Sequence, residues 1–156
     1  MIPSDTEFDI GSQLFPLLVE KGVPFFAQKR FFNWIDIGNV KDYWQVSQNV
    51  LKGELAHMTM PGTQIADGVW VGLNTRIDWE GTKIEGPVYI GSGSTVEAGS
   101  TIIGPTWIGH GSQICRGSEV TRSVLFEYTR VSPNSHMSEL VVCKDCLLYT
   151  SPSPRD

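Results

Sequence analysis

The dominant feature of this sequence is a hydrophobic repeat with a period of six residues. An isoleucine or valine recurs at every sixth position, with a single seven-residue step between Ile77 and Ile84. These positions, called anchors below, are Ile65, Val71, Ile77, Ile84, Ile90, Val96, Ile102, Ile108, Ile114 and Val120. A small or β-branched residue follows four positions after each anchor: Val69, Thr75, Gly81, Val88, Ser94, Ser100, Thr106, Ser112, Ser118 and Val124. A fixed short period of this kind is typical of stacked-repeat proteins.

Strand geometry explains the period. Side chains alternate between the two faces of a strand, so each anchor and its small residue share one face. The polar, glycine-rich remainder of each six then turns a corner. Three sixes close a triangular coil of about 18 residues, and successive coils stack at about 4.8 Å. Each buried anchor contributes roughly 1.5–3 kcal/mol. The ten anchors predict a little over three coils of parallel β-helix, with a bulged corner at Gly81–Lys83.

The first 53 residues have a different, mixed α/β pattern. Asp9 or Ser12 can cap a helix that carries Leu14, Leu17 and Leu18 on one side and ends at Gly22. Two short strands are predicted next, over residues 23–27 and 31–36. A second helix is predicted from Asn39 to Leu51, with Asp42 in its first turn and Tyr43, Val46, Val50 and Leu51 on its buried side.

Several segments of this first part resemble the end of the sugar-1-phosphate nucleotidyltransferase domain. They are Phe8–Gly11 (FDIG) with Leu14–Pro16 (LFP), Trp34–Gly38 (WIDIG), Asp42–Trp44 and Val50–Gly53. The hexapeptide repeat that follows is also similar to this family. The likeness is strongest to mannose-1-phosphate guanylyltransferase-like enzymes, with the glucose-1-phosphate thymidylyl- and uridylyltransferase types nearby. The resemblance implies an α/β remnant of the catalytic domain in residues 1–53, a linker in 54–64, and an incomplete left-handed parallel β-helix in 65–145.

The same resemblance implies an activity. The family joins a nucleoside triphosphate to a sugar 1-phosphate and releases pyrophosphate, a displacement that depends on positioning and on charge neutralisation by Mg²⁺. The aspartate of the W-x-D-I-G segment is a Mg²⁺ ligand in the family, and this position is Asp36 here. From the residue alone, a turn-capping role for Asp36 is the more common one. The rest of the family's catalytic machinery is absent, so we expect an inactive fragment of a GDP-mannose type enzyme.

Two alternative functions use the repeat itself. Many hexapeptide-repeat proteins are acyltransferases with a histidine base, and His110 lies at a predicted corner, where an exposed role is the more common one. The second alternative is a non-catalytic scaffold or regulatory subunit, with Trp70, Trp79 and Trp107 at outward or corner positions as contact residues. Assembly into a homo-oligomer is expected in either case.

Charge and hydropathy narrow the choice of partners and location. The net charge of -5 argues against nucleic acid, which favours a basic face, although a local nucleotide site is compatible with it. No apolar run approaches the roughly 20 residues of a membrane span, and the N-terminus has no secretory pattern. A cytoplasmic location is therefore expected.

The last eleven residues require a separate interpretation. The sequence CLLYTSPSPRD matches the translation of a transposase adapter used in short-read sequencing libraries. We therefore expect residues 146–156 not to be native, and the natural protein to continue beyond Asp145. On this interpretation, the C-x-x-C pair of Cys143 and Cys146 carries no redox or zinc function.

Overall fold

The computed structural model describes residues 2–32, 34–144 and 146–149, the last four by their backbone alone. The final residues of the proposed adapter, 150–156, lie outside the described part of the chain. The chain divides into two compact units, Met1–Phe32 and Asn33–Asp156, and each is described by itself.

The first unit contains one short helical segment. A π-helical turn, η1 (Ile10–Leu14), continues directly into α1 (Phe15–Glu20). Asp9 caps the segment as predicted, because its side chain accepts a hydrogen bond of 2.5 Å from the backbone N–H of Ser12. Gly22, with φ of +62°, follows the end of α1 in the left-handed conformation that glycine tolerates.

The two strands predicted after α1 do not form, and that prediction was wrong. The described residues of 23–38 make no ladder with another strand. Aromatic composition favours a strand only where a neighbouring strand supplies hydrogen-bond partners and a surface to pack on. The side chains of Phe26 and Phe31 are instead 94% and 96% exposed.

The second predicted helix is confirmed as α2 (Val40–Leu51), with Asn39 as its N-cap. Gly53, with φ of +71°, lies just beyond its end as expected. The fully buried residues of α2 are Leu51, which the pattern predicted, and Gln48, which it did not.

Fifteen short strands follow α2 in the described chain. Their bounds are β1 (Thr63–Ala66), β2 (Val69–Val71), β3 (Arg76–Ile77), β4 (Lys83–Glu85), β5 (Val88–Ile90), β6 (Thr95–Val96), β7 (Thr101–Ile103), β8 (Thr106–Ile108), β9 (Gln113–Ile114), β10 (Glu119–Thr121), β11 (Val124–Leu125), β12 (Arg130–Val131), β13 (His136–Ser138), β14 (Leu140–Cys143) and β15 (Cys146–Tyr149). Every third strand from β2 onwards falls in the same sheet.

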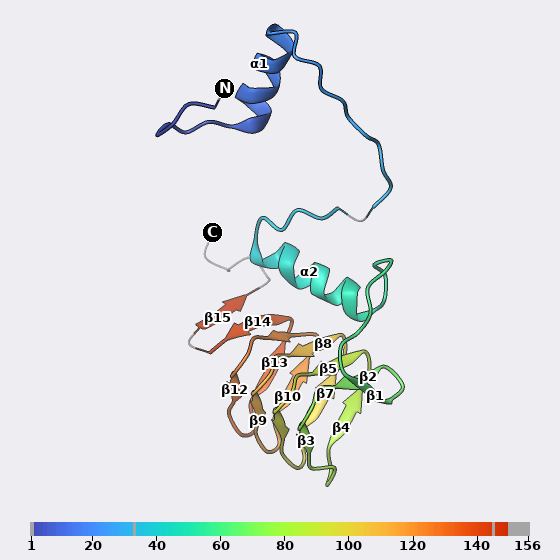
Figure 1. The fold of residues 1–156 in the computed structure, drawn as a ribbon. Coiled ribbons are helices and arrows are strands. Elements are labelled where there is room, and N and C mark those ends of the chain that lie inside the picture. The colour runs from blue at the N-terminus through green and yellow to red at the C-terminus, as the bar shows by residue number, and fades with distance from the viewer. Residues whose placement is uncertain (1, 33, 145, 150–156) are drawn as a thin grey trace. The chain divides into compact units, whose positions relative to one another are not determined.

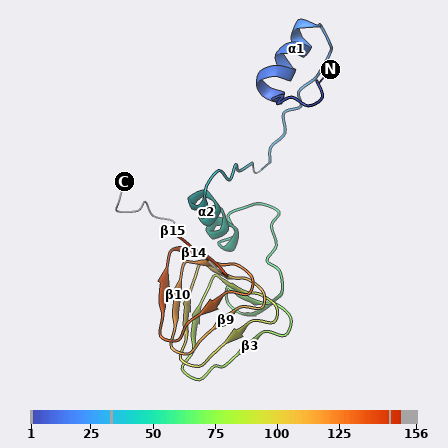
Figure 2. The same cartoon turned by 90° about the vertical axis from the view of Figure 1, so that its left-hand side faces the viewer.

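The predicted parallel β-helix is therefore confirmed. One sheet has the order β1-β2-β5-β8-β11-β14-β15, the second β13-β10-β7-β4, and the third β12-β9-β6-β3. Strands of successive coils pair in parallel, as β2 does with β5 and β5 with β8, and Figure 2 shows the coils stacked one behind another. At the two ends of the first sheet, β1 and β15 pair antiparallel with β2 and β14. We call this seven-stranded sheet the helix-bearing sheet, because α2 lies on it.

The number of coils differs from the prediction. The spacing between paired anchors is 19 residues from Val71 to Ile90, 18 from Ile90 to Ile108, and 17 from Ile108 to Leu125. A further 17 residues lead from Leu125 to Val142, which gives about four coils rather than a little over three. The last coil escaped the pattern because the step from Val120 to Leu125 has five residues.

Two assignments at the ends of the repeat were also wrong. Ile65 is not an interior anchor, because it lies in the antiparallel strand β1 and is 45% exposed. Val124 pairs with Trp107, so it faces outward, and Ser123 takes the interior small position instead. The extra residue before Ile84 is accommodated at the corner between β3 and β4, near Gly81, as predicted.

The interior of the solenoid combines apolar anchors with buried hydroxyl groups. The anchors Ile90, Ile102, Ile108, Ile114 and Leu125 are fully buried. Many of the small residues are buried serines and threonines whose hydroxyls donate to backbone carbonyls. Some of these carbonyls belong to the next coil, as for Ser94 with Gly109 over 3.0 Å, and others to the same coil, as for Ser118 with Cys115 over 2.6 Å. Because these groups find partners, their burial carries little desolvation penalty.

Helix α2 covers the outer face of the helix-bearing sheet. It crosses the strands between β14 and the β1–β2 hairpin (Figure 1) and contacts β8 and β14. Its 12 residues extend for about 18 Å at 1.5 Å per residue. Five parallel strands at about 4.8 Å spacing cover a similar length. The outward aromatic residues of this sheet, among them Trp107, therefore lie under a helix rather than in solvent.

Candidate functional site

The start of α2 is fixed by a reciprocal pair of hydrogen bonds. The Asn39 side chain accepts from the backbone N–H of Asp42 over 2.9 Å, and its amide nitrogen donates to the Asp42 carboxylate over 2.7 Å. Asn39 itself has an extended backbone, with φ of −156°, as an N-cap requires. The capping role therefore belongs to Asn39, and Asp36 does not perform it.

Asp36 lies three residues before this N-cap, in the segment that precedes α2. Its side chain is exposed, and its carboxylate forms no hydrogen bond or ion pair with the described residues. A carboxylate without other partners can accept a hard cation, and Mg²⁺ in nucleotide sites commonly uses one or two protein carboxylates together with phosphate oxygens. The Asp36 side chain fits the role of such a protein carboxylate.

A complete metal centre is not formed by the described residues. Within residues 2–32 and 34–144, no three His, Cys, Asp or Glu side chains gather closely enough to hold a metal ion. Asp36 can therefore supply one ligand, and phosphate oxygens or a carboxylate outside this part of the chain would have to supply the rest.

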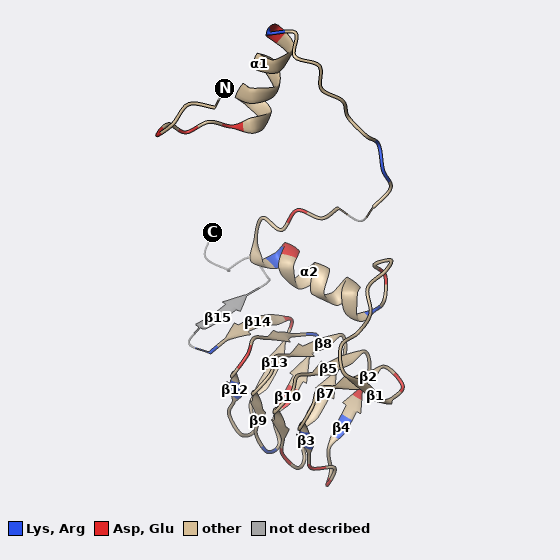
Figure 3. Cartoon of the chain, viewed as in Figure 1, with Lys and Arg blue, Asp and Glu red and all other residues tan. Residues whose placement is uncertain are grey.

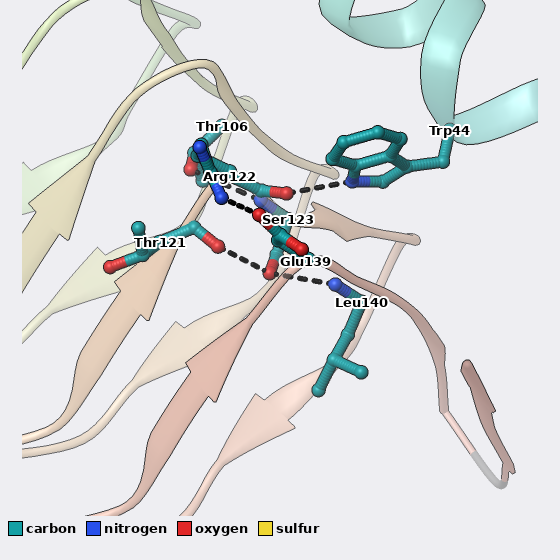
Figure 4. Close-up of polar contacts among 7 residues, drawn as sticks. All are labelled: Trp44, Thr106, Thr121, Arg122, Ser123, Glu139 and Leu140. Atoms are coloured by element: carbon teal, nitrogen blue, oxygen red, sulfur yellow. Dashed lines mark hydrogen bonds and ion pairs between the residues drawn. The ribbon is translucent and has the colours of Figure 1, made fainter. Parts of the chain in front are cut away.

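A side-chain hydrogen bond attaches α2 to the solenoid. The indole N–H of Trp44 donates to the backbone carbonyl of Arg122 over 2.7 Å (Figure 4). Arg122 occupies the tight corner before β11 with φ of +43°, and its guanidinium forms an ion pair with Glu139 of the next coil. Ser123 bonds to the coils on both sides, because its N–H donates to Thr106 of the preceding coil and its hydroxyl accepts from the N–H of Leu140 of the following coil. The carbonyl that binds Trp44 is thus held by two neighbouring coils.

An aromatic contact makes a second attachment between α2 and the solenoid. The rings of Tyr43 and Phe126 are stacked, with centroids 5.6 Å apart and planes inclined by 21°. Burial raises the pKa of the Tyr43 phenol above its ordinary value, with a smaller opposing contribution from its hydrogen bond with Ser47. We call the two contacts, Trp44 with Arg122 and Tyr43 with Phe126, the helix latch.

The segment that carries Asp36 joins this latch through its neighbour. Ile37 and Tyr43 both line two shallow hollows beside α2, of about 310 and 240 Å³. Phe126 and Val141 complete the first hollow, and Trp107 belongs to the second. The residue directly after Asp36 therefore lies against the seam between the helix and the solenoid.

The acyltransferase candidate, His110, lies at an exposed corner of the solenoid. Its Nε2 is 3.0 Å from the hydroxyl of Tyr128 on the next coil, and the two rings meet edge to face. The side-chain contacts of His110 with the described residues are with Tyr128, and neither is with a carboxylate.

The three tryptophans proposed as contact residues differ in their surroundings. Trp107 packs against Tyr89 with ring centroids 4.2 Å apart and planes inclined by 37°, and it lies beside α2; Trp70 is half-buried in the same sheet. Trp79 is 56% exposed. The packing of Trp107 on a helix agrees with the interpretation that outward aromatics contact the preceding part of the chain.

The pattern did not predict a polar cluster on a second face of the solenoid. Glu97 accepts a hydrogen bond of 2.9 Å from the backbone N–H of Arg116 and one of 2.8 Å from the Gln113 side chain. These bonds, the first above all, and the positive charges of Arg116 and Arg130 lower the pKa of Glu97. The cluster borders a shallow hollow of about 340 Å³ that also includes Arg76 and Asp78.

Charge is otherwise mixed over the described surface. Basic and acidic residues alternate along the solenoid, and the middle of α2 carries neither (Figure 3). Helices α1 and α2 fall short of the length and apolar character that a membrane span requires.

Comparison with known proteins now adds to this geometry. The chain is 45% identical over 141 residues to the UTP–glucose-1-phosphate uridylyltransferase of Synechocystis sp.. The chain is a homologue of a sugar nucleotidyltransferase. The alignment covers 90% of the chain but 36% of the relative, so the chain spans about a third of that enzyme's length. No protein-family model matches the chain.

This relative corrects one expectation and supports a broader one. The resemblance to sugar-1-phosphate nucleotidyltransferases agrees with it, whereas the finer likeness to the mannose-1-phosphate guanylyltransferase type finds no support. The name of the relative specifies UTP and glucose 1-phosphate as its substrates. The W-x-D-I-G and F-D-I-G segments identified the broad class but not the nucleotide or the sugar.

Proposed function

We propose that this chain is part of a sugar-1-phosphate nucleotidyltransferase of the UDP-glucose type. The reaction would join UTP and glucose 1-phosphate: an oxygen of the sugar phosphate bonds to the α-phosphorus of UTP, the bond from this phosphorus to the bridging oxygen breaks, and pyrophosphate leaves. Support comes from the 45% identity to an enzyme named for these substrates. Because the chain spans 36% of that enzyme, the activity is proposed for the complete protein.

Within this proposal, Asp36 is a ligand of Mg²⁺. A bound Mg²⁺ would neutralise negative charge on the phosphate oxygens during the displacement. Asp36 supports this role because its carboxylate is exposed and has no partner among the described residues, while Asn39 performs the capping that would otherwise account for an aspartate here. The contribution of the chain is to hold this carboxylate at the start of α2.

The test uses the full-length protein with UTP, glucose 1-phosphate and Mg²⁺, and follows pyrophosphate release. Asp36→Asn keeps the shape of the side chain and removes its charge. We expect kcat/KM to fall by about a hundredfold or more, since metal neutralisation is worth several kcal/mol. Asp67→Asn is the matched control, because Asp67 is an exposed aspartate in the β1–β2 turn, and it should leave the rate unchanged.

Other results would redirect the proposal. Equal activity of the two variants would remove Asp36 from the metal site. Pyrophosphate release with GTP and mannose 1-phosphate but not with UTP would contradict the UDP-glucose assignment. Release with neither pair would favour the scaffold function, for which size measurements of the homo-oligomer would be the next step.

A further inference from the structure

We propose that the solenoid is the support that positions Asp36, and that Trp44 is the positioning residue that transmits this support. The inference rests on the proposed function for the metal role of Asp36. It goes further, because it assigns a task in the active site to a domain that contributes no reacting group. The juxtaposition that carries it is the helix latch beside the Ile37–Asn39 turn.

Asp36 lies a short chain distance from a fixed point of the backbone. Asn39 is the N-cap of α2, and its bonds with Asp42 hold the backbone there. Only Ile37 and Gly38 lie between Asp36 and Asn39, so the two Cα atoms, three chain steps apart, are at most about 10 Å from each other. Ile37, the residue between Asp36 and Gly38, lines both hollows together with Tyr43, and 48% of it remains exposed. The position of α2 therefore limits the position of the Asp36 carboxylate.

A contact with the solenoid holds α2. Among the described residues, the Trp44–Arg122 hydrogen bond of 2.7 Å connects the helix to the solenoid across 78 positions in sequence. Its acceptor is a backbone carbonyl that the Arg122–Glu139 ion pair and the Ser123 bonds tie to two coils. Such a carbonyl cannot rotate away as a side chain can. The solenoid thus presents a rigid acceptor, and the hydrogen bond from Trp44 fixes α2 relative to it.

Metal sites have a small positional tolerance. Groups that hold a metal or a reacting phosphate act only within about 0.5 Å of their productive position, and their supporting contacts decide whether they stay there. A misplacement of about 1 Å caused by a distant change can cost roughly a hundredfold in rate. Loss of the latch would free the start of α2 and with it the turn that carries Asp36.

The first experiment measures the mobility of this turn without any metal. Backbone ¹⁵N relaxation of the 156-residue chain gives order parameters for Asp36, Ile37 and Gly38. We expect values near 0.8 in the parent chain, as in rigid backbone, and below about 0.6 in Trp44→Ala. Trp44→Phe keeps most of the packing but lacks the N–H donor, so it should fall between them. Trp79→Ala is the control, since Trp79 lies at an exposed corner.

This experiment also separates unfolding from release of the turn. Amide shifts of the buried anchors, such as Ile102 and Ile114, report the solenoid core and should be unchanged in each variant. If the turn is equally mobile in the parent chain and in Trp44→Ala, with the core intact, the solenoid does not position Asp36. If Trp44→Ala also changes the amide shifts of the core, the variant has lost its fold. The mobility of the turn in Trp44→Phe is then compared with the parent chain in its place.

The second experiment connects the turn to the metal in the full-length protein. We expect Trp44→Ala to raise the Mg²⁺ concentration for half-maximal rate by about tenfold or more. Asp36→Asn should remove most of the difference between Trp44→Ala and its parent, because the two residues act on one ligand. A released turn with an unchanged Mg²⁺ requirement would uphold the mechanical link and reject the metal role. High order parameters for this turn in all variants would reject the mechanical link between the solenoid and Asp36, whatever Mg²⁺ concentration each variant requires.

Discussion

Replacement of Gln48 by methionine should stabilise the protein. Gln48 is 2% exposed, and neither its amide nitrogen nor its amide oxygen has a hydrogen-bond partner among the described residues. A buried polar group without a partner costs about 1–3 kcal/mol. Methionine is unbranched, similar in length and flexible enough to fill the same space. Its helix propensity is close to that of glutamine, so the change in stability reports the amide.

We expect a gain of about 2 kcal/mol in the free energy of unfolding. In a unit of this size, that gain raises Tm by roughly 8 °C. Urea titration followed by far-UV circular dichroism measures it directly. Gln45→Met is the matched control on the exposed side of α2, where it removes a hydrogen bond of 2.9 Å to Asn49 worth about 0.2–0.5 kcal/mol. A Gln48→Met protein that is no more stable than its parent would refute the reasoning, since its amide would then have partners.

Three further outcomes follow from the solenoid. Ile90→Asp places an unpaired charge in the core and should abolish the cooperative thermal transition, whereas Ile65→Asp on the exposed β1 should cost less than about 1 kcal/mol. Gly109→Ala should cost about 1–3 kcal/mol in urea titration, because the new Cβ would lie 2.6 Å from backbone atoms of the next coil, and a neutral effect would show that the coils can separate there. The lowered pKa of Glu97 adds stability above its unfolded pKa that is lost as pH falls through the folded value. Glu97→Gln should therefore flatten the acid limb of the stability curve, and an unchanged limb would remove Glu97 as its source.

The regular part of the fold was predictable because one physical requirement repeats. Each coil needs an apolar anchor on each side, so the alternation of Ile and Val with small residues specified the interior down to single residues such as Ile90 and Ile114. The pattern failed where this requirement is met with another spacing. A five-residue step before Leu125 hides the fourth coil, and an antiparallel strand places Ile65 outside the core.

The candidate site was predictable only in part. The W-x-D-I-G segment indicated Asp36 because the motif is local in sequence, and the N-cap at Asn39 followed from local hydrogen bonding. The latch could not be predicted in the same way. Trp44 binds a backbone carbonyl 78 positions away. Every residue has such a carbonyl, so the identity of Arg122 does not indicate that its carbonyl accepts this bond. The two strands expected before Asp36 fail for a related reason, since a strand exists only with its neighbours.

Helix α2 also changes how the coils melt. In an open stack, each coil contacts only its neighbours, so coils can unravel one at a time from an end. Here a single rigid rod contacts β8 and β14 and is bonded to the corner before β11, so it fastens several coils to one another directly. Fraying of one coil would detach the rod from the others. The strapped coils should consequently unfold as one cooperative block, with gradual unravelling confined to the edges that α2 does not reach.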